Sequence, residues 1–180
     1  MTTSSQALVT NLLVEKFQGL NLTVNVNGTA TPVDVYDGPE GPDNEDNFIL
    51  VMGWPESGDD TSTSTERWAY LGTATRYEQY DLAIVINCFV GGDDSFAATP
   101  ASGSDAQAAV RTNAESIQSA VEAACLADIN LSVQNGGTAP IIYGYITGSR
   151  FSQAVPDDGA MGRYAQYGLR YHVYNVLWTA

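Results

Sequence analysis

Acidic side chains have the clearest potential for chemistry in this sequence, and many of them fall in one stretch. Ten Asp and Glu residues lie between Asp34 and Glu66, with no Lys or Arg among them. Nine of these acids lie in two loop-like segments, 37–47 and 53–66, and the candidates among them are Asp37, Glu40, Asp43, Glu45, Asp46, Asp59 and Asp60. Such a group could bind a cation, act as paired catalytic carboxylates, or keep a surface negative.

The spacing of these acids along the chain does not fit a cation site or a pair of catalytic carboxylates. An EF-hand loop needs oxygen ligands at alternate positions, a glycine at the sixth position and a glutamate at the twelfth. Residues 37–47 instead place glycines and prolines at the early ligand positions. Glycosidases use two carboxylates on opposite sides of one bond, whereas neighbouring acids in a hydrated loop rarely converge on one atom and keep ordinary pKa values. This argument covers the three Asp-Asp pairs, at 59–60, 93–94 and 157–158.

The remaining reactive residues also lack a recognisable arrangement. His172 is the single histidine, and the chain has no G-x-S-x-G elbow that would place a nucleophile beside it. Its spacing from Cys88 and Cys125 matches no zinc motif. Both phosphate-binding glycine motifs, G-x-x-x-x-G-K and G-x-G-x-x-G, are also missing. We therefore predict no catalytic residue, no metal site and no cofactor, and we expect that the protein is not an enzyme.

Composition limits the partners. The 180 residues carry 21 acids and 7 bases, a formal charge of −14. Such a chain repels DNA phosphates and anionic membranes, because DNA affinity depends on Lys and Arg displacing counterions.

No apolar run reaches the roughly 18 residues that a membrane-spanning helix needs. The N-terminal segment has no positively charged n-region of a signal peptide, so we expect it to stay on the protein. Two cysteines do not make a disulfide framework, and we expect two buried thiols.

Hydrophobic periodicity predicts the elements that must position these residues. Helical spacing predicts a helix over 4–18 and a longer one over 105–127, with Ser104 as its N-cap. The apolar face of the longer helix is Val110, Ala114, Ile117, Val121 and Ala124. Asn27-Gly28 predicts a tight hairpin turn within 22–36. Strands are predicted over 48–52, 76–90, 141–151 and 163–178.

The order of these elements predicts the fold class. In the last strand, one face carries Ala165, Tyr167, Leu169, Tyr171, Val173 and Leu177, an alternation typical of a half-buried strand. Two consecutive C-terminal strands joined by a loop should be antiparallel. We expect an α+β fold over 1–180 as a single domain: a mainly antiparallel β-sheet with the long helix packed across one face, and an N-terminal helix. Extended acidic loops are predicted at 37–47, 53–66 and 91–104.

The ordered set of segments resembles the tail terminator proteins of long-tailed bacteriophages. The resemblance begins with SQALVTNLLVEKF, VYDGPEGPDNED and FILVMGWP. It continues with YEQYDLAIVINCFVGGDD, AQAAVRTNAESIQSAVEAACLADINL and the C-terminal IIYGYITGSRFSQAVPDDGAMGRYAQYGLRYHVYNVLW. It covers nearly the whole chain through the order of its segments, since no single residue is a chemical signature.

This resemblance implies a virion structural protein assembled in the host cytoplasm and located in the neck of the tail. The family forms a homohexameric ring at the head-proximal end of the tail tube. The ring stops polymerisation of the major tail tube protein and joins the head-completion, or stopper, protein of the neck. DNA passes through its channel without specific binding. Two alternatives stay open: another neck component, such as a head-closure or tail-completion protein, and an acidic enzyme or ligand-binding module.

Two physical expectations accompany the resemblance. Acids such as those between Asp34 and Glu66 would repel the duplex from a channel wall and let it slide, whereas a basic wall would retain it through salt-dependent contacts. Tyrosines are frequent in the C-terminal strands and suit interfaces as well as an ordinary sheet core. They are Tyr143, Tyr145, Tyr164, Tyr167, Tyr171 and Tyr174.

Overall fold

The computed structural model describes residues 6–38, 47–51, 65–69, 75–91, 100–131, 141–154 and 162–178, with the backbone alone described for 65–69, 75–78, 100–105, 141–142, 154 and 176–178. In these ranges the chain forms two helices and eight strands. In chain order they are α1 (Gln6–Gln18), β1 (Thr23–Val26), β2 (Thr29–Pro32), β3 (Asp34–Asp37), β4 (Phe48–Val51), β5 (Thr65–Ala69), β6 (Thr75–Gly91), α2 (Pro100–Ala127), β7 (Ile141–Ala154) and β8 (Gly162–Trp178).

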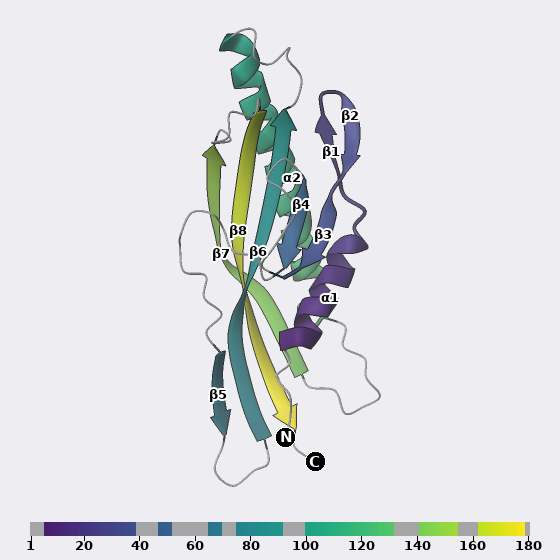
Figure 1. Cartoon of the computed structure of the whole chain (residues 1–180). Helices are drawn as coiled ribbons and strands as arrows, with labels where there is room; N and C mark the ends of the chain where they lie inside the picture. The colour runs from purple at the N-terminus through teal and green to yellow at the C-terminus, as the bar shows by residue number, and fades with distance from the viewer. Residues whose placement is uncertain are drawn as a thin grey trace.

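Strands β6 and β8 form the centre of the main sheet. They pair antiparallel along all 17 residues of each strand, from Thr75 opposite Trp178 to Gly91 opposite Gly162. The strand order is β3-β4-β6-β8-β7, and β5 pairs with β6 beyond the end of β4. Figure 1 shows the long strands crossing where the sheet twists strongly. The expected α+β fold with a mainly antiparallel sheet is confirmed.

One pairing departs from that expectation. Strands β3 and β4 run parallel, with Asp34 opposite Phe48 and Asp37 opposite Val51. The predicted hairpin over 22–36 accordingly ends earlier than expected. Its second arm, β2, stops at Pro32, whose nitrogen has no hydrogen to donate to a ladder. Val33 then turns into the core, and the chain joins the main sheet as β3.

The hairpin turn itself forms as predicted. Asn27 and Gly28 both adopt positive φ, 51° and 86°, as a two-residue type I′ turn requires. The Asn25 side chain accepts a hydrogen bond of 2.7 Å from the Gly28 amide. Val24 is buried, and Asn113 of α2 donates to the Asn25 carbonyl at 2.9 Å. The β1–β2 sheet is thereby fixed to the helical layer.

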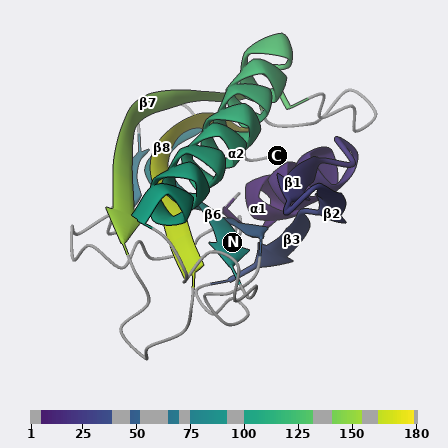
Figure 2. The same cartoon turned by 90° about the horizontal axis from the view of Figure 1, so that it is seen from above.

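Helix α2 lies across one face of the main sheet, as predicted (Figure 2). Val110, Ala114, Ile117 and Val121 are buried against the strands. The apolar face ends at Cys125, which is buried, whereas the predicted Ala124 is partly exposed. Burying such a side chain contributes about 1.5–3 kcal/mol for each large aliphatic residue, which makes this helix face a main source of stability.

The start of α2 and the ends of the predicted loops need correction. The helix begins at Pro100 and not after Ser104, since proline suits a first helical turn, where the amide hydrogen has no partner within the helix. Residues 100–104 of the predicted loop 91–104 are therefore helical, and Gly91 belongs to β6. Likewise Thr65 and Glu66 of the predicted loop 53–66 belong to β5, and Asp37 of the predicted loop 37–47 ends β3. The remainders of these loops lie outside the described residues, apart from Gly38 and Asn47.

Helix α1 packs on the same side of the sheet as α2. Val9, Leu13 and Phe17 are buried in the same core as the helix-facing side chains of β6 and β8. Lys16 forms an ion pair of 2.8 Å with Asp128, just beyond α2, and so links the two helical segments. Neither described helix is long and apolar enough to cross a bilayer.

The core also depends on a close approach between β7 and β8. The ring of Tyr171 lies over Gly144, and a Cβ added at Gly144 would fall 2.1 Å from the tyrosine oxygen. That hydroxyl is buried without a hydrogen-bond partner. Burial raises the pKa of Tyr171 above its ordinary value.

We predict that Gly144→Ala lowers the free energy of unfolding by about 1–3 kcal/mol, because the added methyl overpacks the core. Gly148→Ala in the same strand is the matched control, since a Cβ there meets nothing within 4 Å. Tyr171→Phe should leave stability unchanged or raise it, because it removes an unpaired buried hydroxyl. Urea denaturation followed by circular dichroism measures all three. Equal losses for the two alanine variants would contradict this view of the packing.

Candidate functional site

The predicted acidic cluster is only partly visible in the structure. Asp37 is the last residue of β3, and its side chain is exposed. The other predicted acids, Glu40, Asp43, Glu45, Asp46, Asp59 and Asp60, lie outside the described residues. The expectation that these seven acids face a channel or an interface therefore stays a prediction from the sequence.

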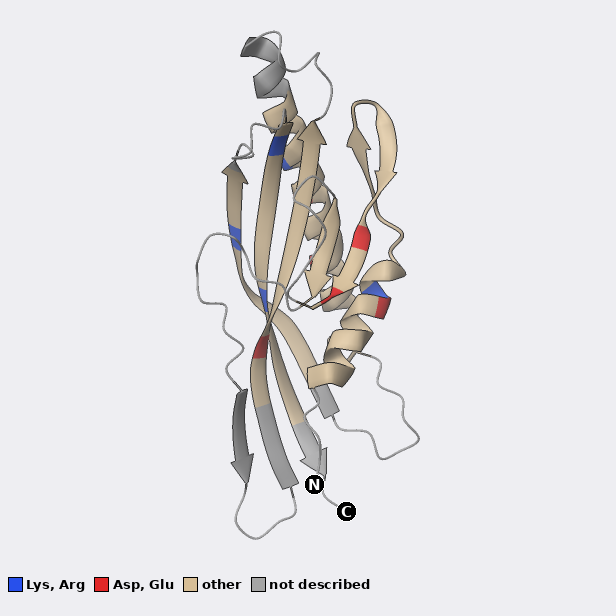
Figure 3. Cartoon of the chain, in the orientation of Figure 1, with Lys and Arg blue, Asp and Glu red and all other residues tan. Residues whose placement is uncertain are grey.

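The charge of the chain is nevertheless unevenly divided. The described side chains include seven carboxylates and five cations, a formal charge of −2, so −12 of the total −14 belongs to the other side chains. The described carboxylates are Glu15, Asp34, Asp37, Asp81, Glu115, Glu122 and Asp128, and the cations are Lys16, Arg111, Arg150, Arg163 and Arg170. Figure 3 shows these charges spread thinly over a mostly uncharged framework. The negative charge thus belongs mainly to the segments that connect the strands.

His172 has a partner that the sequence did not reveal. It stands directly opposite Asp81 in the β6–β8 pair, and its Nδ1 lies 2.7 Å from Asp81 Oδ1. Both side chains are about a quarter exposed, at 26% and 28%. Tyr145 of β7 occupies the next place in the same row, with its ring centroid 5.5 Å from the imidazole. The three side chains form a polar row on the face of the sheet opposite α2.

This row orients an imidazole, as the acid does in a catalytic triad, but a triad also needs a nucleophile near Nε2. The two thiols lie on the opposite, helix-facing side of the sheet, in the core. No group of three His, Cys, Asp or Glu residues able to hold a metal ion occurs in the part of the chain that the structure describes. The row therefore fits a surface contact better than a reaction centre. Asp81, the single charge in the run from Gln79 to Val90, was the sequence signal that would have pointed to it.

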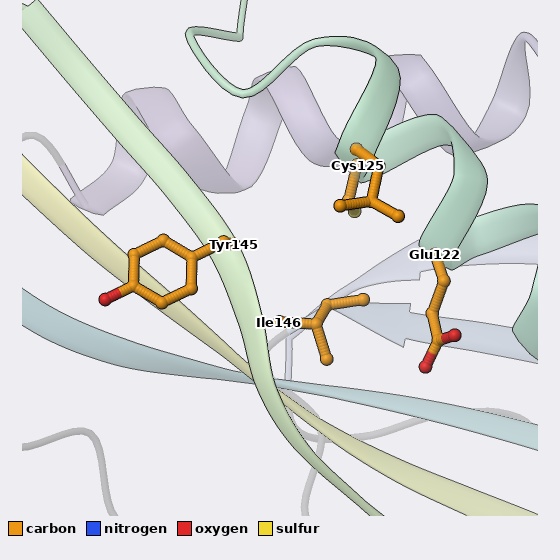
Figure 4. Close-up of a pocket in the computed structure, with 5 residues that line it drawn as sticks. Glu122, Cys125, Tyr145 and Ile146 are labelled. Carbon is orange, nitrogen blue, oxygen red and sulfur yellow. The ribbon is translucent and has the colours of Figure 1, made fainter.

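The thiols are placed as expected. Cys88 and Cys125 are both free and almost fully buried. Burial raises the pKa of each thiol to about 12. Cys125 borders a shallow depression of about 210 Å³ between α2 and β7, together with Glu122, Leu126, Tyr145 and Ile146. In Figure 4 the Tyr145 ring points away from Cys125 and Glu122, so these groups do not converge on one point.

The six C-terminal tyrosines divide between core and surface. Tyr171 is fully buried on the helix-facing side of the sheet. Tyr167 lies on the same side and is partly buried, and its ring contacts that of Phe151, with the ring centroids 4.7 Å apart. On the opposite face Tyr143 and Tyr145 are 42% and 47% exposed. Tyr164 and Tyr174 share that face and are half-buried. The interface interpretation thus applies to the face that includes Tyr143, Tyr145 and the Asp81–His172 pair, which we call the open face.

The sequence matches no protein-family model and no curated protein.

We predict that neither thiol reacts with Ellman's reagent in the native protein at pH 8. With a pKa of about 12, only about one thiol in ten thousand is ionised at that pH, and the thiolate is the reacting form. Both should react in 6 M guanidinium chloride, which is the internal control. Fast labelling of the native protein at either position would show that the core opens there.

Proposed function

We propose that this chain is a virion structural protein, the tail terminator of a long-tailed bacteriophage. In this role it forms a homohexameric ring on the head-proximal end of the tail tube. The ring ends polymerisation of the tube protein and binds the head-completion protein of the neck. It works by shape and charge and is not an enzyme.

The open face is the observation that carries the proposal. Tyr143 and Tyr145 are both more than 40% exposed on rigid, hydrogen-bonded strands, and Tyr145 is itself part of the polar row with His172 and Asp81. Exposed aromatic side chains are characteristic of protein interfaces, because they bury a large area at a low cost in conformational entropy. A face of this kind favours a protein that binds other proteins as a fixed block.

Two further features support the same role. The element order proposed from the resemblance, an N-terminal helix, strands, a long helix and two long C-terminal strands, is the order in the structure. The side chains outside the described set carry a net charge of −12, whereas the described framework is nearly neutral. A ring that lets DNA pass needs a channel wall that the duplex does not bind.

The assembly can be tested with purified protein and tail tubes. We expect particles of six subunits in mass photometry, rings in negative-stain images, and label at one end of each tube. Adding the protein during tube polymerisation should stop growth at both low and high tube-protein concentration. Binding to the portal-side complex in the absence of a tail would instead indicate a head-closure protein, and binding along the sides of tubes would contradict the proposal.

The channel charge needs a separate experiment. Replacing the seven predicted acids by Asn and Gln should slow DNA ejection at low salt, because less repulsion holds the duplex from the wall. The difference should shrink at high salt, where a Debye length of about 3 Å at 1 M screens the wall. Virions carrying Glu115→Gln and Glu122→Gln on α2 serve as the control for acid removal elsewhere. Unchanged ejection kinetics at low salt would exclude a role for these acids in passage.

A further inference from the structure

Continuous rows of paired residues connect the two edges of the main sheet. One row runs from Arg150 through Gly168, Val85 and Leu50 to Tyr36. A neighbouring row, two residues along each strand, runs from Ser152 to Asp34. Side chains two apart on a strand share a face. Arg150 and Asp34 therefore lie on the same face of the sheet, at its two opposite edges.

The β7 end of these rows is exposed and basic. Thr147 to Phe151 are five consecutive exposed residues, and Arg150 and Arg170 are exposed beside one another on the β7–β8 pair. Within the described residues, β8 is the strand that pairs with β7. On the other side of β7, the Gly144 amide donates one backbone hydrogen bond to the Ile129 carbonyl. We call Thr147–Ser152 together with Arg170 the β7 flank.

The β3 end is exposed and acidic. Asp34 and Asp37 begin and end β3, and both side chains are exposed. Tyr36 between them is half-buried, with its ring 6.3 Å from that of Phe48. We call Asp34–Asp37 the β3 flank. Figure 3 shows blue segments on β7 and β8 and red segments on β3 at the opposite edge, with one further red segment on β6 and both colours on α1.

We infer that the β7 flank of one copy of this chain binds the β3 flank of the next copy. Arg150 and Arg170 then face Asp34, which lies on the same face of the sheet, and Asp37 adds negative charge at that edge from the helix-facing side. Two chains of charge −14 repel each other at most orientations. Association is therefore favoured where a locally basic surface meets an acidic one. The chain offers the β7 flank as the basic surface and the β3 flank, at the opposite end of the same rows, as the acidic one.

The contact joins two different surfaces, so every copy keeps one unused flank of each kind and a series of copies can close into a ring. The inference rests on the proposed ring and specifies which surfaces form it. Side chains form this contact, and the backbone hydrogen bonds of the sheet do not continue from one copy to the next. The reason is that each edge is interrupted. At β3 the Gln18 side chain donates to the outward-facing Val35 carbonyl at 3.5 Å, and β7 has a bulge between Ile146 and Gly148.

Charge reversal at each flank tests the inference. The first variant carries Arg150→Glu and Arg170→Glu, and the second carries Asp34→Lys and Asp37→Lys. Each alone should weaken self-association at least about tenfold in sedimentation equilibrium, because like charges then face each other. An equimolar mixture should recover to within about threefold of the wild type, since each reversed flank finds a reversed partner. Arg111→Glu with Glu115→Lys, two exposed charges on α2, is the matched control.

Every outcome decides between the inference and its alternatives. Thermal unfolding of each variant shows that the monomer is folded before association is compared. Recovery in the mixture supports a contact between the two flanks. If the first variant loses association while the second keeps it, the β7 flank binds a surface other than the β3 flank, and the inference is wrong. Rings and capped tubes that tolerate both reversals overturn the inference and leave the proposed function standing. A wild-type chain that neither self-associates nor caps tubes overturns both.

Discussion

The pairing of β6 with β8 is the constraint on which the rest of the structure depends. Because the two strands pair through all 17 positions, their described side chains, at 79–91 and 162–175, alternate between opposite faces of the sheet. The helix-facing set, from Tyr80 to Val90 and from Ala165 to Val173, forms one continuous apolar surface that α1 and α2 cover. A one-residue slip would exchange the two faces and place Asp81 and His172 in the core.

The pairing of β6 with β8 also determines where the outer strands lie and which of their side chains are exposed. Strands β4 and β5 share one edge of β6, and β7 occupies the free edge of β8. Gly144 lets β7 approach the Tyr171 ring, which brings Tyr143 and Tyr145 beside His172 on the opposite face. The framework is nearly neutral and its two edges carry opposite local charge, whereas most of the acidic charge belongs to side chains outside it. A rigid block with two unlike edges suits repeated assembly through side-chain contacts.

Local patterns predicted most of the elements. Helical spacing located α1 and the buried face of α2 as far as Val121. Runs of strand-forming residues located β6 and β7, and alternation located β8, each within a few residues. The Asn27-Gly28 turn was predictable because both residues tolerate positive φ, a property of the residues themselves. The prediction was wrong where the end of an element depends on a neighbour. Strand β3 separates from the hairpin because β4 pairs with it, and the loop-like composition of 100–104 did not prevent a helix from beginning at Pro100.

Of the candidate site, the sequence determined the chemical inventory: one histidine, two cysteines, an excess of acids, and tyrosines concentrated in the last two strands. The expectation that both thiols are buried is confirmed, although the helix face predicted from the sequence ended at Ala124 and not at Cys125. Only the tertiary structure decided that His172 meets Asp81, that Tyr143 and Tyr145 are exposed while Tyr171 is buried, and that Arg150 and Asp34 mark opposite edges. These facts depend on the register between strands far apart in the chain. That register is set by the packing of the whole core and by no short stretch of sequence.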